Sequence, residues 1–209
     1  LDEAGFKVDE NNFDALVLWS HKLSADEFSD NRHCIGRAGA GYNNIPVDEA
    51  TEKGIVVFNT PGANANAVKE LVVCGLLLAS RGIVQGSVFS SSLESPDDNA
   101  LNQSVEQAKK TFKGNEVQGK TLGIIGLGAI GSMVAQSAAS LGMKIIGYDP
   151  HISIDAAWRL PSDVEKASSI PALLKKSDYI SIHVPLIDET KNLIDSEAFM
   201  AMKTGTKLI

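Results

Sequence analysis

A glycine-rich turn between a strand-forming run and a helix-forming run constrains this chain more than any other feature. Residues 126–131 have the sequence Gly-Leu-Gly-Ala-Ile-Gly, between the apolar run Thr121–Ile125 and the alanine-rich stretch Ala129–Leu141. In such a motif the first glycine permits the tight turn, the second lets a diphosphate approach the backbone, and the third lets the helix pack close to the strand. The sequence therefore predicts a strand–turn–helix unit that binds a dinucleotide. The three glycines are Gly126, Gly128 and Gly131.

The helix after the turn and the next strand supply the other parts of such a site. A helix N-terminus has free N–H groups and a partial positive charge, which favour a diphosphate. The strand Lys144–Asp149 ends in an aspartate at about the spacing of 20 residues that the motif requires. Asp149 is expected to accept hydrogen bonds from both adenosine ribose hydroxyls and to repel a 2′-phosphate, so we predict NAD rather than NADP. The alternative is a glycine-rich turn in an α/β protein that binds no nucleotide.

A second motif just upstream resembles a nucleoside triphosphate P-loop, because residues 114–121 satisfy G-x-x-x-x-G-K-[ST]. That loop works only where a strand enters it and a helix leaves it, so that the helix N-terminus meets the phosphates. Here a polar helix is predicted to enter and the strand Thr121–Ile125 to leave. We therefore reject the P-loop interpretation.

Strand-length apolar runs alternate with helix signals along the chain, which is typical of parallel βαβ units. A long helix is predicted over Asn66–Val84, apolar almost all round from Leu71 to Ala79 and so buried on most faces. The stretch Gly86–Asn102, rich in Ser, Asp and Pro, is the best candidate linker. We predict an α/β fold with two incomplete domains, residues 1–95, ending in an interdomain helix at about 66–84, and residues 96–209. The strands expected in the first domain are Phe13–Trp19, Cys34–Gly39 and Gly54–Asn59.

The second domain is expected to open with a polar helix at about Gln103–Phe112, ahead of the glycine turn. The elements expected after Asp149 are a helix, a strand, another helix and a strand that the end of the chain interrupts. Their ranges are Ile170–Lys176, Tyr179–Val184, Asp195–Met202 and Lys207–Ile209. Because a chain rarely ends inside a buried strand, and this one begins at Leu1, we interpret the sequence as a fragment truncated at both ends.

Composition argues against several classes of function. The 209 residues carry a net charge of −7, whereas a nucleic-acid-binding protein usually has a basic face. The longest apolar run, around Leu71–Ala79, has about half the length that spans a bilayer. Cys34 and Cys74 lie in apolar surroundings and are expected to be buried, reduced thiols, which favours a cytoplasmic location. No cluster of residues has the spacing of a metal site.

One histidine occupies a position that suggests a role. His183 ends an apolar strand and precedes Val184 and Pro185, at the edge where the carboxyl ends of parallel strands face a ligand crevice. It could border the cofactor, or it could simply pack at a strand end, and the sequence leaves both interpretations open. The other three histidines show no partner pattern and are expected at the surface; they are His21, His33 and His151.

Four segments together resemble the D-2-hydroxyacid dehydrogenase family, in the family's order. They are Arg37–Ile45 (RAGAGYNNI), Asn59–Leu71 (NTPGANANAVKEL), the glycine turn with Tyr148-Asp149-Pro150, and His183–Leu186 (HVPL) with Thr190 and Leu193-Ile194. The stretches RAGAGYNNIP and AVKEL look most like the phosphoglycerate dehydrogenase branch of that family.

The resemblance implies a fold and a set of roles. A flavodoxin-like α/β substrate domain would lie beside a Rossmann-type, doubly wound cofactor domain, with the active site between them. Ala38 and Gly39 would present backbone N–H groups to the substrate carboxylate, and Asn64 would help to hold the substrate. The contacts to NAD would come from Thr60, Ala129, Ile130, Asp149 and Val184, with His183 and Pro185 alongside.

The reaction implied is NAD-dependent hydride transfer at C2 of a D-2-hydroxyacid, with 3-phospho-D-glycerate, the entry to serine biosynthesis, as the expected substrate. Trp19 stands where that branch usually has an arginine for the substrate phosphate, and tryptophan is no charged bidentate donor. A hydroxypyruvate or glyoxylate reductase therefore stays open, or Ser20 and His21 carry more of the phosphate contact. The family's catalytic Arg, Glu and His lie beyond Ile209, so we assign no catalytic residue and expect the fragment to be inactive.

A second hypothesis is a non-catalytic, NAD-sensing binding protein, because some relatives of this fold act in that way. Under either hypothesis we expect small-molecule ligands and neither nucleic acid nor membrane as partners. The apolar helix Asn66–Val84 would be a liability if it were exposed, so we expect a homodimer or homotetramer.

Overall fold

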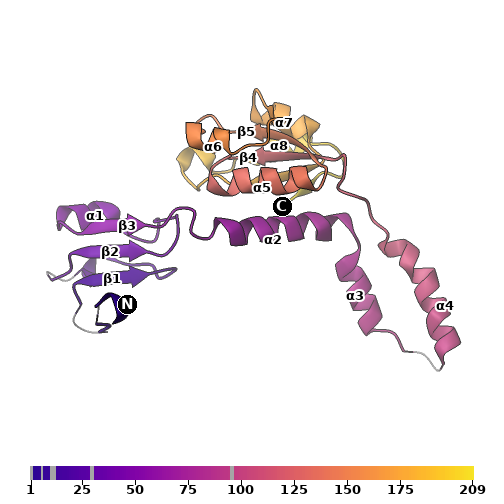
Figure 1. The fold of residues 1–209 in the computed structure, drawn as a ribbon, viewed down its shortest axis with the longest axis horizontal. Helices are drawn as coiled ribbons and strands as arrows, with labels where there is room; N and C mark the ends of the chain where they lie inside the picture. Colours follow the sequence, from indigo (N-terminus) through magenta and orange to yellow (C-terminus); the bar gives the residue numbers. More distant parts are fainter. Residues whose placement is uncertain (1, 6, 10–12, 29–30, 95–96) are drawn as a thin grey trace. The chain divides into compact units, whose positions relative to one another are not determined.

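In a computed structural model the chain forms two compact units, Leu1–Asn64 and Ala65–Ile209, each built on its own parallel sheet (Figure 1). The structure describes residues 2–5, 7–9, 13–28, 31–94 and 97–209. Helix α2 (Ala65–Ser80) falls in the second unit because it packs on α5 (Ala129–Ser140). The functional domain boundary predicted near residue 95 stays a prediction, because compactness alone does not define a domain's role.

The first unit is a three-stranded parallel sheet in the order β1-β2-β3. Its strands are β1 (Ala15–Leu18), β2 (Cys34–Arg37) and β3 (Val56–Asn59), and its helical segments are η1 (Asp2–Ala4), η2 (Ala25–Glu27) and α1 (Val47–Glu52). Its core is formed by Leu18, Leu23, Phe28, Ile35, Ile45, Ala50 and Ile55. The three predicted strands are confirmed, each somewhat shorter than the apolar run that predicted it.

The second unit contains a five-stranded parallel sheet in the order β6-β5-β4-β7-β8. Its strands are β4 (Thr121–Ile125), β5 (Lys144–Tyr148), β6 (Glu165–Lys166), β7 (Tyr179–Ile182) and β8 (Lys207–Leu208). From β4 the chain builds outward to β6 and then crosses to β7 on the other side of β4. In doubly wound sheets ligands bind at this switch point, beside the carboxyl ends of the two central strands.

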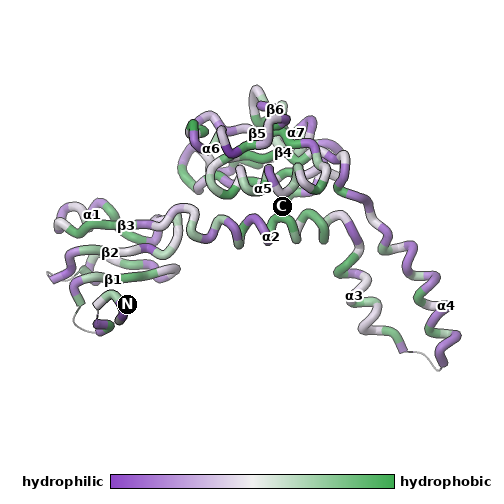
Figure 2. The backbone as a smooth tube through the Cα atoms, viewed as in Figure 1, coloured by the Kyte–Doolittle hydropathy of each residue, from purple (hydrophilic) through white to green (hydrophobic). Residues whose placement is uncertain are grey.

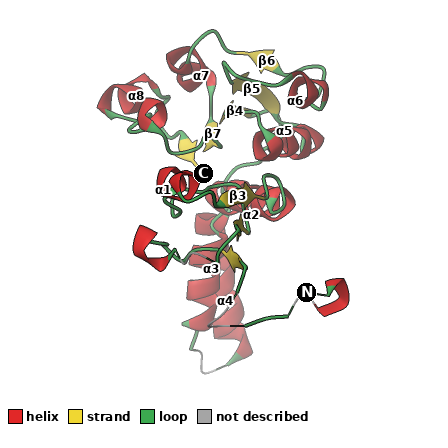
Figure 3. Cartoon of the chain, turned by 90° about the vertical axis from the view of Figure 1, so that its left-hand side faces the viewer, coloured by secondary structure: helices red, strands yellow, loops and turns green. Residues whose placement is uncertain are grey.

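Helices cover both faces of the second sheet (Figure 3). Helices α5 and α2 cover one face, and Leu122, Ile124 and Tyr179 of the sheet lie in the core under these helices. Helices α7 (Ile170–Lys176) and α8 (Ser196–Ala201) cover the other face, over Ile125, Ile146 and Ile180. Strand β4 is therefore buried on both faces, and Figure 2 shows it as largely hydrophobic. The short segments α6 (Ile154–Trp158), η4 (Asp188–Thr190) and β6 were not predicted.

The long helix predicted over Asn66–Val84 is wrong at its C-terminal end. Helix α2 stops at Ser80, and α3 (Ile83–Ser91) starts after a turn at Arg81–Gly82. Two backbone hydrogen bonds impose the break, because Gly82 donates to the Phe112 carbonyl at 3.2 Å and Asn115 donates to the Ser80 carbonyl at 2.8 Å. A Cβ at Gly82 would lie 2.8 Å from Phe112 Cα, so only glycine fits this contact.

The predicted linker Gly86–Asn102 is also wrong in most of its length. Helix α3 occupies its first part, and α4 (Asp98–Ala108) occupies its last part, followed by η3 (Lys109–Phe112). The Asp97 carboxylate accepts the Ala100 N–H at 2.9 Å, which is an N-cap. The polar helix predicted from Gln103 therefore begins earlier, at a cap signal that the Ser- and Asp-rich composition obscured.

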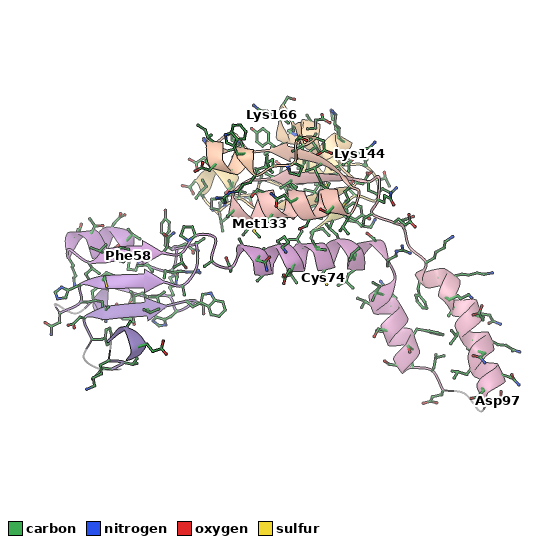
Figure 4. The ribbon with its side chains drawn as sticks, in the orientation of Figure 1. Phe58, Cys74, Asp97, Met133, Lys144 and Lys166 are labelled. Atoms are coloured by element: carbon green, nitrogen blue, oxygen red, sulfur yellow. The ribbon has the colours of Figure 1, made fainter. Side chains whose placement is uncertain are left out.

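Two burial predictions are corrected. Helix α2 is buried on one face only, because Val72 and Leu76 are in the core whereas Leu71 is 72% exposed. Cys74 is exposed on the same helix (Figure 4), and Cys34 is half-buried, so neither cysteine is the fully buried thiol that was expected. Of the described helices, none alone is long and apolar enough to cross a membrane; α2 and α3 pass that test only as a pair bent by 71°.

Candidate functional site

The glycine turn lies at the switch point of the second sheet, where β4 passes into α5. Gly126 has φ +90°, and a Cβ there would lie 2.8 Å from the carbonyl group of His183. A Cβ at Gly131 would lie 2.0 Å from the Gly126 carbonyl oxygen. Gly128 has open space where a Cβ would point. Two of the glycines are therefore needed for backbone packing, and the third leaves room beside the backbone for a ligand.

The first turn of α5 faces that room with unpaired donors. Among the described residues, the N–H groups of Gly128, Ala129 and Ile130 have no hydrogen-bond acceptor. Hydrogen bonding within the helix starts at Ser132, whose N–H donates to the Gly128 carbonyl at 3.0 Å. Free N–H groups and the helix dipole together attract a diphosphate. The donor set and the open space thus fit the diphosphate of a dinucleotide.

Asp149 directly follows β5 and is fixed beside the turn by two backbone donors. Its Oδ2 atom accepts the Leu127 N–H at 2.8 Å, and its Oδ1 atom accepts the His151 N–H at 2.9 Å. The residue is half-buried, so part of the carboxylate stays open to a ligand. Each oxygen has a further lone pair, and the carboxylate can therefore accept ribose hydroxyls without leaving its position.

The segment after β7 borders the same turn. The His183 N–H donates to the Ile125 carbonyl at 2.7 Å, which extends the β4–β7 pairing by one residue. The His183 ring is half-buried, and burial lowers the pKa of its imidazole below the ordinary 6.5. Val184 is half-buried and packs against Gly126, while Pro185 is exposed. The structure thus brings the predicted residues of the second unit, from Gly126 to Pro185, to one edge of one sheet.

A second glycine-containing loop follows β2 in the first unit. The Ala38 N–H donates to the Leu18 carbonyl at 2.8 Å. The Gly39 N–H is shared between the Arg37 carbonyl at 2.9 Å and the Thr60 hydroxyl at 2.7 Å. Both amides that were predicted to bind a substrate carboxylate are therefore already engaged within the protein.

The next two amides of this loop are the ones left free. Among the described residues, the N–H groups of Ala40 and Gly41 have no acceptor. The loop is tied to the end of β3, because the Asn59 side chain donates to the Ala40 carbonyl at 2.8 Å. The sequence could not locate this pair, since each glycine and alanine of RAGAGYNN offers an N–H and only the tertiary contacts occupy the first two. The substrate-binding role of Ala38 and Gly39 stays a prediction. The hydrogen bonds that their N–H groups already make do not favour it.

Three other predicted positions lie in the first unit. Thr60 is tied to the loop through Gly39, since its N–H donates to the Gly39 carbonyl at 3.0 Å. Asn64 is exposed at the end of the unit. Trp19 directly follows β1 and is 71% exposed, and its carbonyl accepts the Asn44 side chain at 3.2 Å.

Two further predictions are confirmed, the rejection of the P-loop and the exposure of three histidines. Lys120 directly precedes β4, so residues 114–121 do not have the strand-then-helix context that a P-loop requires. His21, His33 and His151 are exposed. No group of three or more potential metal ligands occurs in the part of the chain that the structure describes.

Comparison with known proteins gives matches along the whole chain. Residues 89–209 match the family profile "D-isomer specific 2-hydroxyacid dehydrogenase, NAD binding domain", and residues 2–148 match "D-isomer specific 2-hydroxyacid dehydrogenase, catalytic domain". The chain is 41% identical to the D-3-phosphoglycerate dehydrogenase of Methanocaldococcus jannaschii, over 94% of this chain and 35% of that protein. It is also 41% identical to the hydroxypyruvate reductase of Thermotoga maritima, over 94% of this chain and 59% of that protein.

A similar solved structure is the NAD⁺-bound 3-phosphoglycerate dehydrogenase of Entamoeba histolytica, with a TM-score of 0.71 and 30% identity. The match covers 93% of this chain and 54% of that one. The chain therefore spans between about a third and three fifths of the length of these relatives.

Proposed function

Since the chain belongs to the D-isomer-specific 2-hydroxyacid dehydrogenase family and contains that family's NAD-binding domain, we propose that the whole protein oxidises or reduces a D-2-hydroxyacid with NAD. One observation carries the proposal: the Asp149 carboxylate is held beside a glycine turn whose helix presents free N–H groups. This is the arrangement that binds the ribose and the diphosphate of a dinucleotide.

Each predicted cofactor residue has a proposed task. The amides of Gly128, Ala129 and Ile130 bind the diphosphate, and Gly126 and Gly131 hold the turn in shape. Asp149 accepts the ribose hydroxyls and excludes a 2′-phosphate. When bound, the nicotinamide ring supplies or accepts the hydride, and the protein orients it. The remaining contacts come from Thr60 and from His183, Val184 and Pro185.

For the substrate we propose the loop after β2 as the carboxylate site. The free amides of Ala40 and Gly41 support this placement, because a carboxylate gains charge-assisted hydrogen bonds from adjacent N–H groups. Asn64 adds a polar contact from the end of the same unit. No catalytic residue is assigned within the 209 residues, and we propose that this chain alone binds NAD without turnover.

The expected substrate is 3-phospho-D-glycerate, which would place the protein in serine biosynthesis in the cytoplasm. The 41% identity to a phosphoglycerate dehydrogenase supports it. An equal identity to a hydroxypyruvate reductase, and the exposed Trp19 at the expected phosphate position, support the alternative of hydroxypyruvate or glyoxylate.

Absorbance at 340 nm with the full-length protein and each acid in turn decides between these substrates. No turnover with any 2-hydroxyacid would contradict the enzyme and favour an NAD sensor.

We also propose that the protein is a homodimer or homotetramer that covers the outer face of α2. Leu71, Leu77 and Leu78 are exposed on that face, at 72%, 40% and 39%. An apolar face of this kind is a liability in a monomer. Sedimentation of the full-length protein tests this, with Leu71→Lys expected to weaken association and a monomeric wild type as the contradicting result.

A further inference from the structure

Ser181 and His183 form a hydrogen-bonded pair at the end of β7. Ser181 is completely buried within the strand, and its Oγ atom lies 2.8 Å from His183 Nε2. Side chains two residues apart on a strand point to the same face. Tyr179, two residues before Ser181, points to the same face and packs in the core under α5 and α2. Ser181 and His183 therefore lie on the face that these two helices cover. The histidine ring thus lies on the face of the sheet from which α5 presents its N-terminus.

The direction of this hydrogen bond follows from the burial of the hydroxyl. Within the described residues, Ser181 Oγ has no hydrogen-bond partner other than His183 Nε2. A buried O–H without an acceptor costs about 1–3 kcal/mol, whereas an unused hydroxyl lone pair costs less. The favoured arrangement therefore has Ser181 donating its proton to Nε2.

The donor direction fixes the protonation of the ring. A neutral imidazole carries a single N–H, so a ring that accepts at Nε2 carries its proton on Nδ1. Burial disfavours the charged form of His183, which keeps the ring neutral near pH 7. Nδ1 is then a donor on a half-buried ring whose own backbone lies against Gly126 of the dinucleotide turn.

We propose that Ser181 is a positioning residue that holds His183 in the Nδ1–H tautomer and so presents an N–H donor to an acceptor oxygen of the bound dinucleotide. The tautomer is a property of the chain without ligand. Only the second half, the contact to the dinucleotide, rests on the proposed function. The acceptor is an oxygen atom of the dinucleotide, from a hydroxyl, phosphate or carboxamide group.

Long-range ¹H–¹⁵N correlation spectra of the ligand-free 209-residue chain test the tautomer directly. His183 is expected to show a protonated Nδ1, and Ser181→Ala is expected to shift it toward protonated Nε2. His21 is an internal reference for a ring whose Nε2 carries the proton, because its Nε2 lies 3.2 Å from the Glu27 carboxylate. A protonated Nε2 at His183 in the wild type, or a tautomer unchanged in Ser181→Ala, overturns the proposal.

Calorimetric titration with NAD tests the second half. Ser181→Ala is expected to weaken NAD binding by about 2- to 10-fold, the range that one hydrogen bond supplies. Ser177→Ala is the matched control, because Ser177 is equally buried and its hydroxyl donates to the Leu173 carbonyl at 2.7 Å. Unchanged affinity in Ser181→Ala, or equal loss in both variants, overturns the dinucleotide contact.

A rescue variant separates positioning from packing. Ser181→Thr retains the hydroxyl on a residue type suited to strands and is expected to retain both the Nδ1–H tautomer and the affinity for NAD. If Ser181→Thr does not fold, the spectra of wild type and Ser181→Ala still decide the tautomer. If neither the wild type nor any variant binds NAD, the proposed function and the dinucleotide contact are both contradicted. The tautomer is still decided by the spectra, which need no NAD.

Discussion

The two glycine-containing loops of this protein differ in how their backbone N–H groups become free. In the turn after β4, the donors are free because they belong to the first turn of a helix, which has no internal acceptors for them. In the loop after β2, tertiary contacts with Leu18 and Thr60 occupy two amides and leave the next two free. The first kind of site is specified by local sequence, and the second by the fold around it.

The glycines of the two loops differ in the kind of atom that surrounds them. A Cβ at Gly131 would meet the Gly126 carbonyl, and a Cβ at Gly126 would meet the carbonyl of His183 directly after β7, so both glycines are constrained by backbone atoms. Gly39, with φ +140°, is instead constrained by a side chain, that of Arg37, and is hydrogen-bonded to Thr60, which directly follows β3. The two loops therefore respond differently to mutation, and the following experiments test that difference.

The largest effect is expected from Gly131→Ala in the turn after β4. A Cβ there would lie 2.0 Å from the Gly126 carbonyl oxygen, a backbone atom that cannot move without displacing the turn. We expect a loss of about 3 kcal/mol in the free energy of unfolding, measured by urea denaturation, and loss of NAD binding. Gly128→Ala is the control, since its Cβ meets open space; its stability should change by less than about 0.5 kcal/mol while NAD binding weakens. Equal destabilisation by both variants would contradict this assignment.

The loop after β2 should show a sharp step in hydrogen exchange. The amides of Ala38 and Gly39 are hydrogen-bonded, whereas those of Ala40 and Gly41 are not. We expect the second pair to exchange at least about tenfold faster, measured by NMR. In the full-length protein, a bound 2-hydroxyacid should slow the second pair. Slowing confined to Ala38 and Gly39 would restore the original substrate prediction.

A smaller effect is expected from Thr60→Val, which removes the hydroxyl that accepts the Gly39 N–H. The Gly39 N–H retains its bond to the Arg37 carbonyl, so the cost should be about 1 kcal/mol or less in urea denaturation. Thr60→Ser retains the acceptor and should restore the stability. If Thr60→Val is neutral while the exchange of Gly39 is unchanged, the hydroxyl does not hold this loop.

The smallest effect concerns pH. Burial lowers the pKa of His183 in the folded chain below the ordinary 6.5, so between these two values the unfolded chain binds more protons. His183 therefore contributes its full stability above pH 6.5, and the contribution is lost as the pH falls toward the folded pKa. In urea denaturation from pH 7.5 to 5, the free energy of unfolding should fall more steeply in the wild type than in His183→Asn. Parallel curves would mean that the pKa of His183 is not lowered.

The sequence predicted the parts of the fold that depend on local patterns. The strands β4, β5 and β7, the helix α5 and the residues of the glycine turn all follow from apolar runs and from the spacing of Gly126, Gly131 and Asp149. The break between α2 and α3 was missed, because it is imposed by a hydrogen bond to the Phe112 carbonyl and another from the Asn115 N–H, residues that lie about 30 positions further along the chain.

The free pair Ala40–Gly41 was missed for the same physical reason. Nothing in RAGAGYNN distinguishes one N–H from another until Leu18 and Thr60 accept from the first two. The first part of α4, in contrast, was missed although a local signal was present. Asp97 caps its N-terminus, as an aspartate ahead of a helical stretch commonly does, whereas the predicted helix began only at Gln103.

The binding of NAD and NADP to Asp149→Asn tests the central claim most directly. Asparagine retains one oxygen to accept the Leu127 N–H, so the turn should keep its shape, but the negative charge that favours NAD over NADP is removed. We predict about 10- to 100-fold weaker binding of NAD, as expected for a charge-assisted contact, with NADP binding unchanged or tighter. Equal weakening of both cofactors, or no change in either, would contradict the account.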